Sequence, residues 1–283
     1  LLAVVSLFSG CVNIDNPVDK SELWAGDYRL FQGTSVWPLA RAAHYGDMSG
    51  VRDILRDSPW LADVRDSIYG NTMLMISILH QDYKLFKLLI DSGADINYHN
   101  TYEGKSPLIE ACCYMESGLK FVKVLVEKGA NVNDTTTRAS VVQVSALMVA
   151  SGFGTSSMVE YLIKEGADIN YRNNYGTTPL GEAMLSGRYD IALILLNNGA
   201  DFTSPVYNAL DDKGNSTVPT MLPNALRNDM VEIGSPEYSQ KREVIKFLRT
   251  KGIDYDTVPI PDYVIKEAKE KFPSRWREYL QRY

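Results

Sequence analysis

The chain has 283 residues, of which 45% are hydrophobic and 23% are charged, and this supply of apolar side chains excludes a chain that is disordered over most of its length. Its formal net charge of −6 argues against non-specific nucleic-acid binding, because such binding uses an excess of Lys and Arg to neutralise phosphates. A basic protein partner suits this charge better.

Residues 1–11, LLAVVSLFSGC, are apolar and end in small residues, which is typical of a secretory signal. The segment is shorter than the about 20 residues of a membrane-spanning helix, and we interpret it as a signal peptide remnant. Its end resembles a bacterial lipobox, with Phe8 in place of the usual aliphatic residue. The resemblance implies that Cys11 carries lipid and, with Val12 after it, that the chain is a periplasmic lipoprotein of the outer membrane. The alternative is an ordinary signal peptide in which Cys11 is lost or incidental.

Residues 12–34 show no sustained periodicity, and we predict a tether followed by an irregular N-terminal cap. Trp24, Tyr28, Leu30 and Phe31 are expected to cover the apolar face of the first helices that follow. Such a cap is needed because the end of a stacked array otherwise exposes its core.

Residues 35–256 contain a recurring pattern in which a short apolar run at helical spacing is followed by a glycine. These glycines are Gly93, Gly129, Gly166, Gly199 and Gly252. Each is predicted to end a helix, because glycine adopts the left-handed conformation after a helix end without a steric cost. A helix that ends in the same way five times indicates a repeated unit.

The first helix of each unit is predicted to begin at a triplet similar to Thr-Pro-Leu, where Thr or Ser caps the helix and Pro suits its first turn. The leucine positions are Leu39, Leu74, Leu108, Leu147, Leu180 and Leu222. A small residue three positions later lets neighbouring first helices approach closely. These small residues are Ala42, Ser77, Ala111, Ala150, Ala183 and Ala225.

This combination resembles the ankyrin repeat family, whose unit of about 33 residues consists of a turn, two antiparallel helices and a projecting loop. The resemblance implies an all-α solenoid of six helix-turn-helix units over residues 35–256. Three segments are longer than the pattern requires, namely residues 135–142, 204–218 and 227–240. Long loops in compact repeats are more often functional than accidental, and disorder is the alternative.

Residues 257–283 depart from the repeat pattern and are predicted to form C-terminal capping helices. Asp262 is expected to cap a helix that begins near Tyr263. A second helix, which restarts after Pro273, is expected to contain Trp276 and Tyr279.

Candidate chemistry is sparse, and we predict neither catalysis nor a cofactor. The three histidines fall in different units without metal-ligand spacing, so no metal site is expected. The glycine-rich residues 151–156 follow no strand and are read as a turn between helices rather than a phosphate loop. Cys112 and Cys113 are adjacent, which disfavours a disulfide, and Cys112 is expected to be a small core residue.

Two sets of side chains stand at positions that line the concave, partner-binding surface in proteins of the ankyrin family. The first set, six residues after the leucines, comprises Tyr45, His80, Tyr114 and Phe153. The second set, at the loop tips, comprises Tyr69, Tyr102 and Tyr175, with Glu103 and Lys105 beside Tyr102. Aromatic side chains, and tyrosine in particular, are enriched at binding hot spots. The alternative is that these rings pack between neighbouring units.

The resulting hypothesis is a lipid-anchored, periplasmic protein-binding module with no small-molecule substrate. By analogy of fold and location, the resemblance extends to immunity proteins that neutralise an antibacterial effector, such as a phospholipase of the type VI secretion system. The alternative is an envelope scaffold that binds and stabilises a resident periplasmic enzyme.

Overall fold

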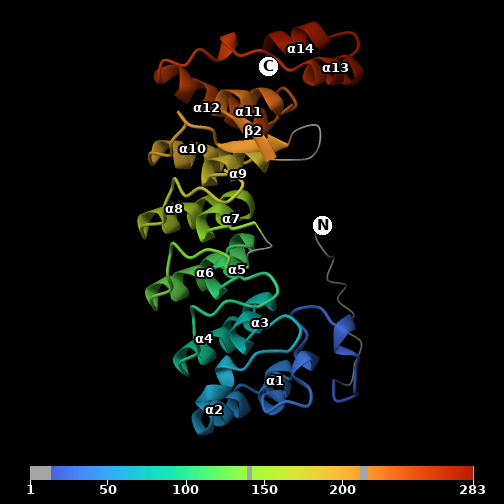
Figure 1. Cartoon of the computed structure of the whole chain (residues 1–283), viewed down its shortest axis with the longest axis vertical. Coiled ribbons are helices and arrows are strands. Elements are labelled where there is room, and N and C mark those ends of the chain that lie inside the picture. The colour runs from blue at the N-terminus through green and yellow to red at the C-terminus, as the bar shows by residue number, and fades with distance from the viewer. Residues whose placement is uncertain (1–13, 139–141, 211–215, 283) are drawn as a thin grey trace. The chain divides into compact units, whose positions relative to one another are not determined.

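A computed structural model describes residues 14–138, 142–210 and 216–282, which are almost wholly helical (Figure 1). The chain divides into an N-terminal unit, residues 1–95 with 100–102, and a C-terminal unit, residues 96–99 with 103–283. Within the described residues, no helix combines the length and hydrophobicity that crossing a membrane requires. Cys11 and the rest of the predicted signal lie outside the described residues, so the lipid anchor stays a prediction.

The N-terminal unit contains two helix pairs. The first repeat consists of α1 (Trp37–His44) and α2 (Met48–Asp57), and the second of α3 (Met73–Leu79) and α4 (Tyr83–Asp91). A short 3₁₀ helix, η3 (Pro59–Asp63), connects them. The second helices, α2 and α4, pack against each other, and η3 fills the space beside α2 and α3.

The C-terminal unit contains the other four repeats. Their helices are α5 (Pro107–Ala111), α6 (Met115–Glu127), α7 (Ala146–Phe153), α8 (Ser156–Lys164), α9 (Pro179–Leu185), α10 (Tyr189–Asn197), α11 (Leu222–Asn228) and α12 (Pro236–Thr250). The first helices, here called inner helices, contact one another in the order α5, α7, α9, α11, and the outer helices follow in the order α6, α8, α10, α12 (Figure 1). The six predicted helix pairs are thus confirmed.

The five predicted glycine stops are confirmed, because φ lies between +81° and +94° at each of them. In the first, the Ala94 N–H donates to the Leu89 carbonyl and the Gly93 N–H donates to the Ile90 carbonyl, both at 3.1 Å. The other four glycines repeat this pair of bonds. It is the Schellman motif, which satisfies the last carbonyls of a helix and requires the left-handed backbone that glycine adopts most easily.

Hydroxyl caps begin four of the six inner helices. The capping residues are Thr72, Ser106, Ser145 and Thr178. The expectation fails for α1 and α11, whose N-cap residues Val36 and Met221 make no such bond, and Thr220 instead ends a strand. All six anchor leucines are buried, and five of the six small residues are as well. Ala42 is only half-buried and lines a hollow beside α1.

A β-hairpin replaces much of the long loop predicted over residues 204–218, and the sequence reading missed it. Strand β1 (Tyr207–Leu210) pairs antiparallel with β2 (Ser216–Thr220). The hairpin is tied to α9, because the Thr178 N–H donates to the Val206 carbonyl at 2.9 Å. A Cβ at Gly181 would lie 2.0 Å from that carbonyl oxygen, so only glycine permits this approach.

The other two long segments are shorter than predicted or only partly described. Residues 227–240 were expected to connect the helices of the sixth repeat, but the connection is confined to residues 229–235, since α12 begins at Pro236 after a Ser235 cap. In residues 135–142, Thr135 forms an isolated bridge with Ser145, and residues 139–141 lie outside the described chain.

The N-terminal segment is packed from Ile14 onward, and residues 12 and 13 of the predicted tether lie outside the described chain. It contains two 3₁₀ helices, η1 (Lys20–Glu22) and η2 (Tyr28–Phe31), and η2 packs on α1. Ile14 is already buried, and Gln32 Nε2 donates to its carbonyl at 2.6 Å. Asp15 adds an ion pair to Arg41 of α1 at 2.8 Å.

The C-terminal cap consists of η4 (Tyr255–Thr257), α13 (Asp262–Lys271) and α14 (Trp276–Arg282). Two capping helices were predicted and are present. Asp262 is not the cap of the first, because it is the first helical residue and Pro261 precedes it. Val264 and Ala268 form a small separate core with Tyr279 of α14.

Candidate protein-binding surface

Tyr45, at the end of α1, is 57% exposed. The guanidinium carbon of Arg41 lies 5.4 Å from the centre of its ring, close enough for a cation–π contact. The two side chains line a hollow of about 430 Å³ together with Trp37, Ala42 and Asp47. This part of the predicted surface offers the Tyr45 ring to a partner, whereas the Arg41 guanidinium is already paired with Asp15.

His80, at the equivalent position of the second repeat, lies against the N-terminal cap. Its ring stacks on Tyr28 with centroids 4.7 Å apart and lies 5.2 Å from the ring of Trp24. Its Nε2 lies 2.7 Å from the Gly26 carbonyl oxygen, and because a carbonyl only accepts, Nε2 carries the proton. The cap therefore contacts one face of the His80 ring, and the residue is exposed to a partner on the rest of its surface.

At the loop tips of the N-terminal unit, one tyrosine is likewise bound to the N-terminal segment and the other is exposed. The Tyr69 hydroxyl donates to the Leu23 carbonyl at 2.6 Å, which binds this ring to the N-terminal segment. Tyr102 meets Tyr69 edge-on at 5.2 Å and is exposed on its other side. Of these two predicted residues, Tyr102 presents more surface to a partner.

In the third repeat, a lysine forms ion pairs with two glutamates. Lys105 Nζ lies 3.1 Å from a carboxylate oxygen of Glu103 and 3.3 Å from one of Glu110. Burial alone would lower the pKa of Lys105, but these carboxylates hold it above its usual value. The half-buried Tyr114 donates its hydroxyl to Glu110 Oε1 at 3.4 Å. The predicted residues Glu103, Lys105 and Tyr114 thus form one hydrogen-bonded cluster.

The fourth and fifth repeats are more open. Phe153, the last residue of α7, is 58% exposed, and Leu185 at the end of α9 is equally exposed. Tyr175 at the loop tip of the fifth repeat is also exposed. Leu185 and the half-buried Glu182 were missed from the sequence, although aligning the anchor leucines places both near the end of an inner helix.

The family model for ankyrin repeats (3 copies) matches residues 39–136 and 137–205, which is more than half of the chain. The chain belongs to the ankyrin repeat family.

Several proteins are similar to part of this chain. It is 31% identical over 159 residues to the Transient receptor potential cation channel subfamily A member 1 homolog of Caenorhabditis elegans, covering 56% of this chain and 12% of that protein. It is 36% identical over 111 residues to the B-cell lymphoma 3 protein homolog of Mus musculus, covering 39% and 23%. It is 28% identical over 137 residues to the Ankyrin repeat protein OPG189 of Monkeypox virus, covering 47% and 22%.

The chain thus spans less than a quarter of each of these three relatives. The family of this chain rests on the match to the ankyrin-repeat model, and ankyrin repeats generally serve as non-enzymatic modules for binding other proteins. The chain is accordingly a protein-binding module, and the helix ends and loop tips described above are its candidate contact residues.

The two cysteines of the ankyrin array are free thiols. Cys112 is fully buried, which confirms the prediction of a small core residue. Burial and the neighbouring Glu110 raise the pKa of Cys113 to about 12, so its thiol stays protonated and is a poor nucleophile. Residues 151–156 were read as a turn between helices rather than a phosphate loop, and the turn is confined to Gly154 and Thr155, because α7 extends to Phe153 and α8 begins at Ser156.

One buried lysine has the electrostatics of a reactive amine but not the access. Burial lowers the pKa of Lys241 to about 7, and its Nζ donates to the Asp229 carbonyl at 2.7 Å. The side chain is almost fully buried, so a substrate cannot reach it. Over the described residues, no group of three or more His, Cys, Asp or Glu side chains has the arrangement of a metal site.

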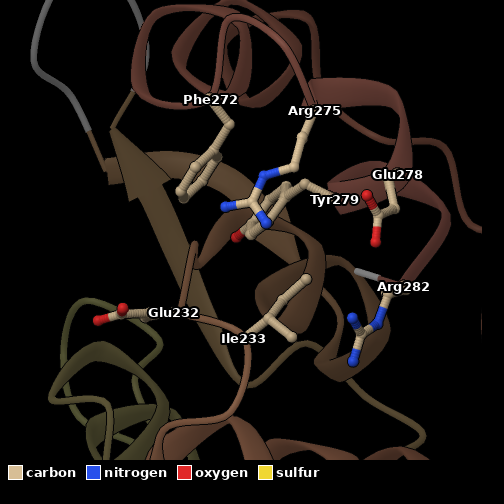
Figure 2. Close-up of a pocket in the computed structure, with 7 residues that line it drawn as sticks. All are labelled: Glu232, Ile233, Phe272, Arg275, Glu278, Tyr279 and Arg282. Atoms are coloured by element: carbon tan, nitrogen blue, oxygen red, sulfur yellow. The ribbon is translucent and has the colours of Figure 1, made fainter.

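A hollow in the C-terminal cap is shown in Figure 2. Phe272 and Tyr279 stack in its wall with centroids 4.7 Å apart, and Arg275 extends from the segment before α14 toward Tyr279. Two arginines and two glutamates line it, so the charges balance. Its volume of about 200 Å³ is below the about 300–1,000 Å³ of typical ligand pockets, and the hollow is better explained as the packing surface of the cap.

Proposed function

We propose that this ankyrin chain is an immunity protein that binds and neutralises an antibacterial effector in the periplasm, such as a phospholipase of the type VI secretion system. The observation that carries the proposal is the open end of the inner helices in the C-terminal unit, where Phe153 is 58% exposed. The location rests on the lipobox-like residues 1–11, whose Cys11 would attach the module to the outer membrane.

The row of inner-helix ends is suited to inhibit an effector by covering the surface that the effector uses. An inhibitor of this kind needs no chemistry, because it acts by occupying the surface through which its target meets substrate. The inner helices are packed in series, so the side chains at their ends are already positioned before binding. Pre-positioned side chains lose little entropy on association, which leaves more of the contact energy for affinity.

The proposal is tested by deleting the gene and growing the mutant against its own parent strain. If the chain is an immunity protein, the parent kills the mutant, and a parent whose secretion apparatus is inactive does not. Expression of the wild-type chain in the mutant should restore survival. Equal survival of mutant and parent would reject the immunity role. Loss of one resident periplasmic enzyme without killing would instead support the scaffold alternative.

The membrane anchor is tested separately with labelled palmitate. The full-length protein should take up the label in a Gram-negative host and sediment with membranes, and Cys11→Ala should lose the label. Labelling that is unchanged in Cys11→Ala would reject lipid attachment at this residue.

A further inference from the structure

Two glutamates occupy the same position in different repeats. Glu110 and Glu182 each follow the anchor leucine of their inner helix by two residues. Glu110 is buried, and its carboxylate is compensated by Lys105 at 3.3 Å and by the Tyr114 hydroxyl at 3.4 Å. The third repeat therefore supplies its own cation to this carboxylate.

The fifth repeat supplies no lysine at the position equivalent to Lys105 to compensate Glu182. The positions that hold Lys105 and Tyr114 in the third repeat are occupied by Thr177 and Ser186 in the fifth. Among the residues that the structure describes, Glu182 has neither an ion-pair partner nor a side-chain hydrogen bond, and burial raises its pKa. A partly dehydrated carboxylate without a partner is unfavourable, and a cation placed against it would relieve that cost.

The half-buried side chain of Glu182 lies beside exposed apolar residues. The glutamate lies over the backbone of Gly152 in α7, where a Cβ would come within 3.3 Å of Glu182 Cγ and 3.1 Å of Ser186 Oγ. Phe153, the residue after that glycine, is exposed, and so is Leu185, three residues after the glutamate. A carboxylate and two apolar side chains thus share the ends of α7 and α9.

We propose that Glu182 binds a Lys or Arg side chain of the protein partner, whose neighbouring apolar side chains cover Phe153 and Leu185. The inference rests on the protein-binding role proposed above, and it specifies the chemistry of the segment that is bound. In the complex, the partner's cation takes the place that Lys105 occupies in the third repeat. A charge-assisted bond to a half-buried carboxylate is stronger than one in open water, and the net charge of −6 favours approach of a basic segment.

The experiment is a selection of random displayed peptides on the full chain, followed by affinity measurements on a selected peptide. The variants are Glu182→Gln, which removes the charge, and Thr177→Lys, which copies Lys105 into the fifth repeat. Glu160→Gln, an exposed carboxylate on α8, is the matched control. The wild type and control should select peptides with a basic residue next to apolar ones. Glu182→Gln should bind such a peptide about 10- to 100-fold more weakly at unchanged melting temperature, and Thr177→Lys should weaken binding similarly, with its melting temperature measured separately because Thr177 is buried.

Two results would overturn the proposal. One is a wild-type selection without basic residues or without any enrichment. The other is a basic peptide that binds Glu182→Gln as tightly as the wild type, even if Phe153→Ala weakens it. These outcomes are separate from the killing assay, because basic peptides selected through Glu182 would support this site even if the deletion mutant survives its parent.

Discussion

His80 and Phe153 stand at the same position of two repeats but have different neighbours. His80 is stacked on Tyr28 and hydrogen-bonded to Gly26, so a segment of the chain itself contacts one side of its ring, although the residue stays exposed. Phe153 is 58% exposed, and nothing in the described chain covers it to the same degree. The comparison teaches that a repeat position does not by itself decide between packing and binding. What decides is whether another segment reaches the end of the inner helix.

The N-terminal segment reaches farther than a cap of the first repeat needs to. Besides packing on α1, it receives hydrogen bonds from Tyr69 and Asn71 of the second repeat at its Leu23 and Ala25 carbonyls. The covered region is therefore the surface around His44 and His80 that the N-terminal segment contacts, and the open region is the set of helix ends that carry Tyr45, Phe153 and Leu185. Each prediction below would break or sharpen this contrast.

The largest effect is expected for Tyr28→Ala. Tyr28 is only 6% exposed and lies between His44 and His80, so truncation should cost about 3–5 kcal/mol of unfolding free energy. Tyr45→Ala, at an exposed ring, should change it by less than about 0.5 kcal/mol. Urea denaturation of both variants makes the measurement. Equal losses would mean that the N-terminal segment does not hold its ring as described.

The sequence allowed the repeats to be predicted, because each anchor is a local signal. A glycine at a helix end and a buried leucine after a turn have the same physical cause in every unit, as Gly93 and Leu74 show. The fate of His80 was not predictable in this way. It depends on Trp24 and Tyr28, which lie more than fifty residues earlier and meet the ring only in the folded chain.

The difference between Glu110 and Glu182 was less predictable than the repeat anchors and more predictable than the contacts of His80. It can be seen from the sequence once the leucines are aligned, because the partner Lys105 has no counterpart in the fifth repeat. Its meaning required the structure, which shows that Glu110 has its partner and that Glu182 is half-buried without one. The β1–β2 hairpin was missed because its short strands, such as Tyr207–Leu210, carry too few residues to establish a period of two.

The next largest effect is expected for Phe153→Ala, measured as affinity for the protein partner. A hot-spot ring should be worth about 2 kcal/mol or more, which is about a thirtyfold loss of affinity, with little change in melting temperature. His80→Ala is the matched variant, and it should behave in the reverse way. Loss of its stacking and its hydrogen bond should cost about 1–3 kcal/mol of stability and leave affinity nearly unchanged. If both variants lose affinity alike, the contrast between covered and open helix ends is wrong.

A smaller effect is expected in the packing beneath the open surface. Ala150 is fully buried in α7, which lies against both α5 and α9. Ala150→Leu should overpack this stack and cost roughly 1–3 kcal/mol. Ala42→Leu is the control, because the equivalent position of the first repeat is only half-buried. A melting temperature of Ala150→Leu equal to that of the wild type would show that the inner helices are less tightly packed than the structure indicates.

The smallest effect is expected from pH, and it concerns the covered region alone. Burial beneath the N-terminal segment lowers the pKa of His44, with Asp27 opposing the shift and His80 and Arg29 adding to it. The folded state therefore holds the neutral ring more strongly than the unfolded state does. As pH falls through the usual histidine pKa of about 6.5, the unfolded chain takes up the proton first, and the free energy of unfolding decreases. The decrease ends once the pH is below the lowered pKa of the folded state.

The size of that decrease is limited because the His44 side chain is more than a third exposed, so water screens its charge. The urea midpoints of the wild type and of His44→Gln should be measured at pH 7.5 and at pH 5.5. The variant is the control, because any carboxylate that titrates in this range changes the stability of both chains equally. The wild-type midpoint should fall further than that of the variant. Parallel curves would show that the N-terminal segment leaves His44 hydrated, and this residue would then belong with the open region rather than the covered one.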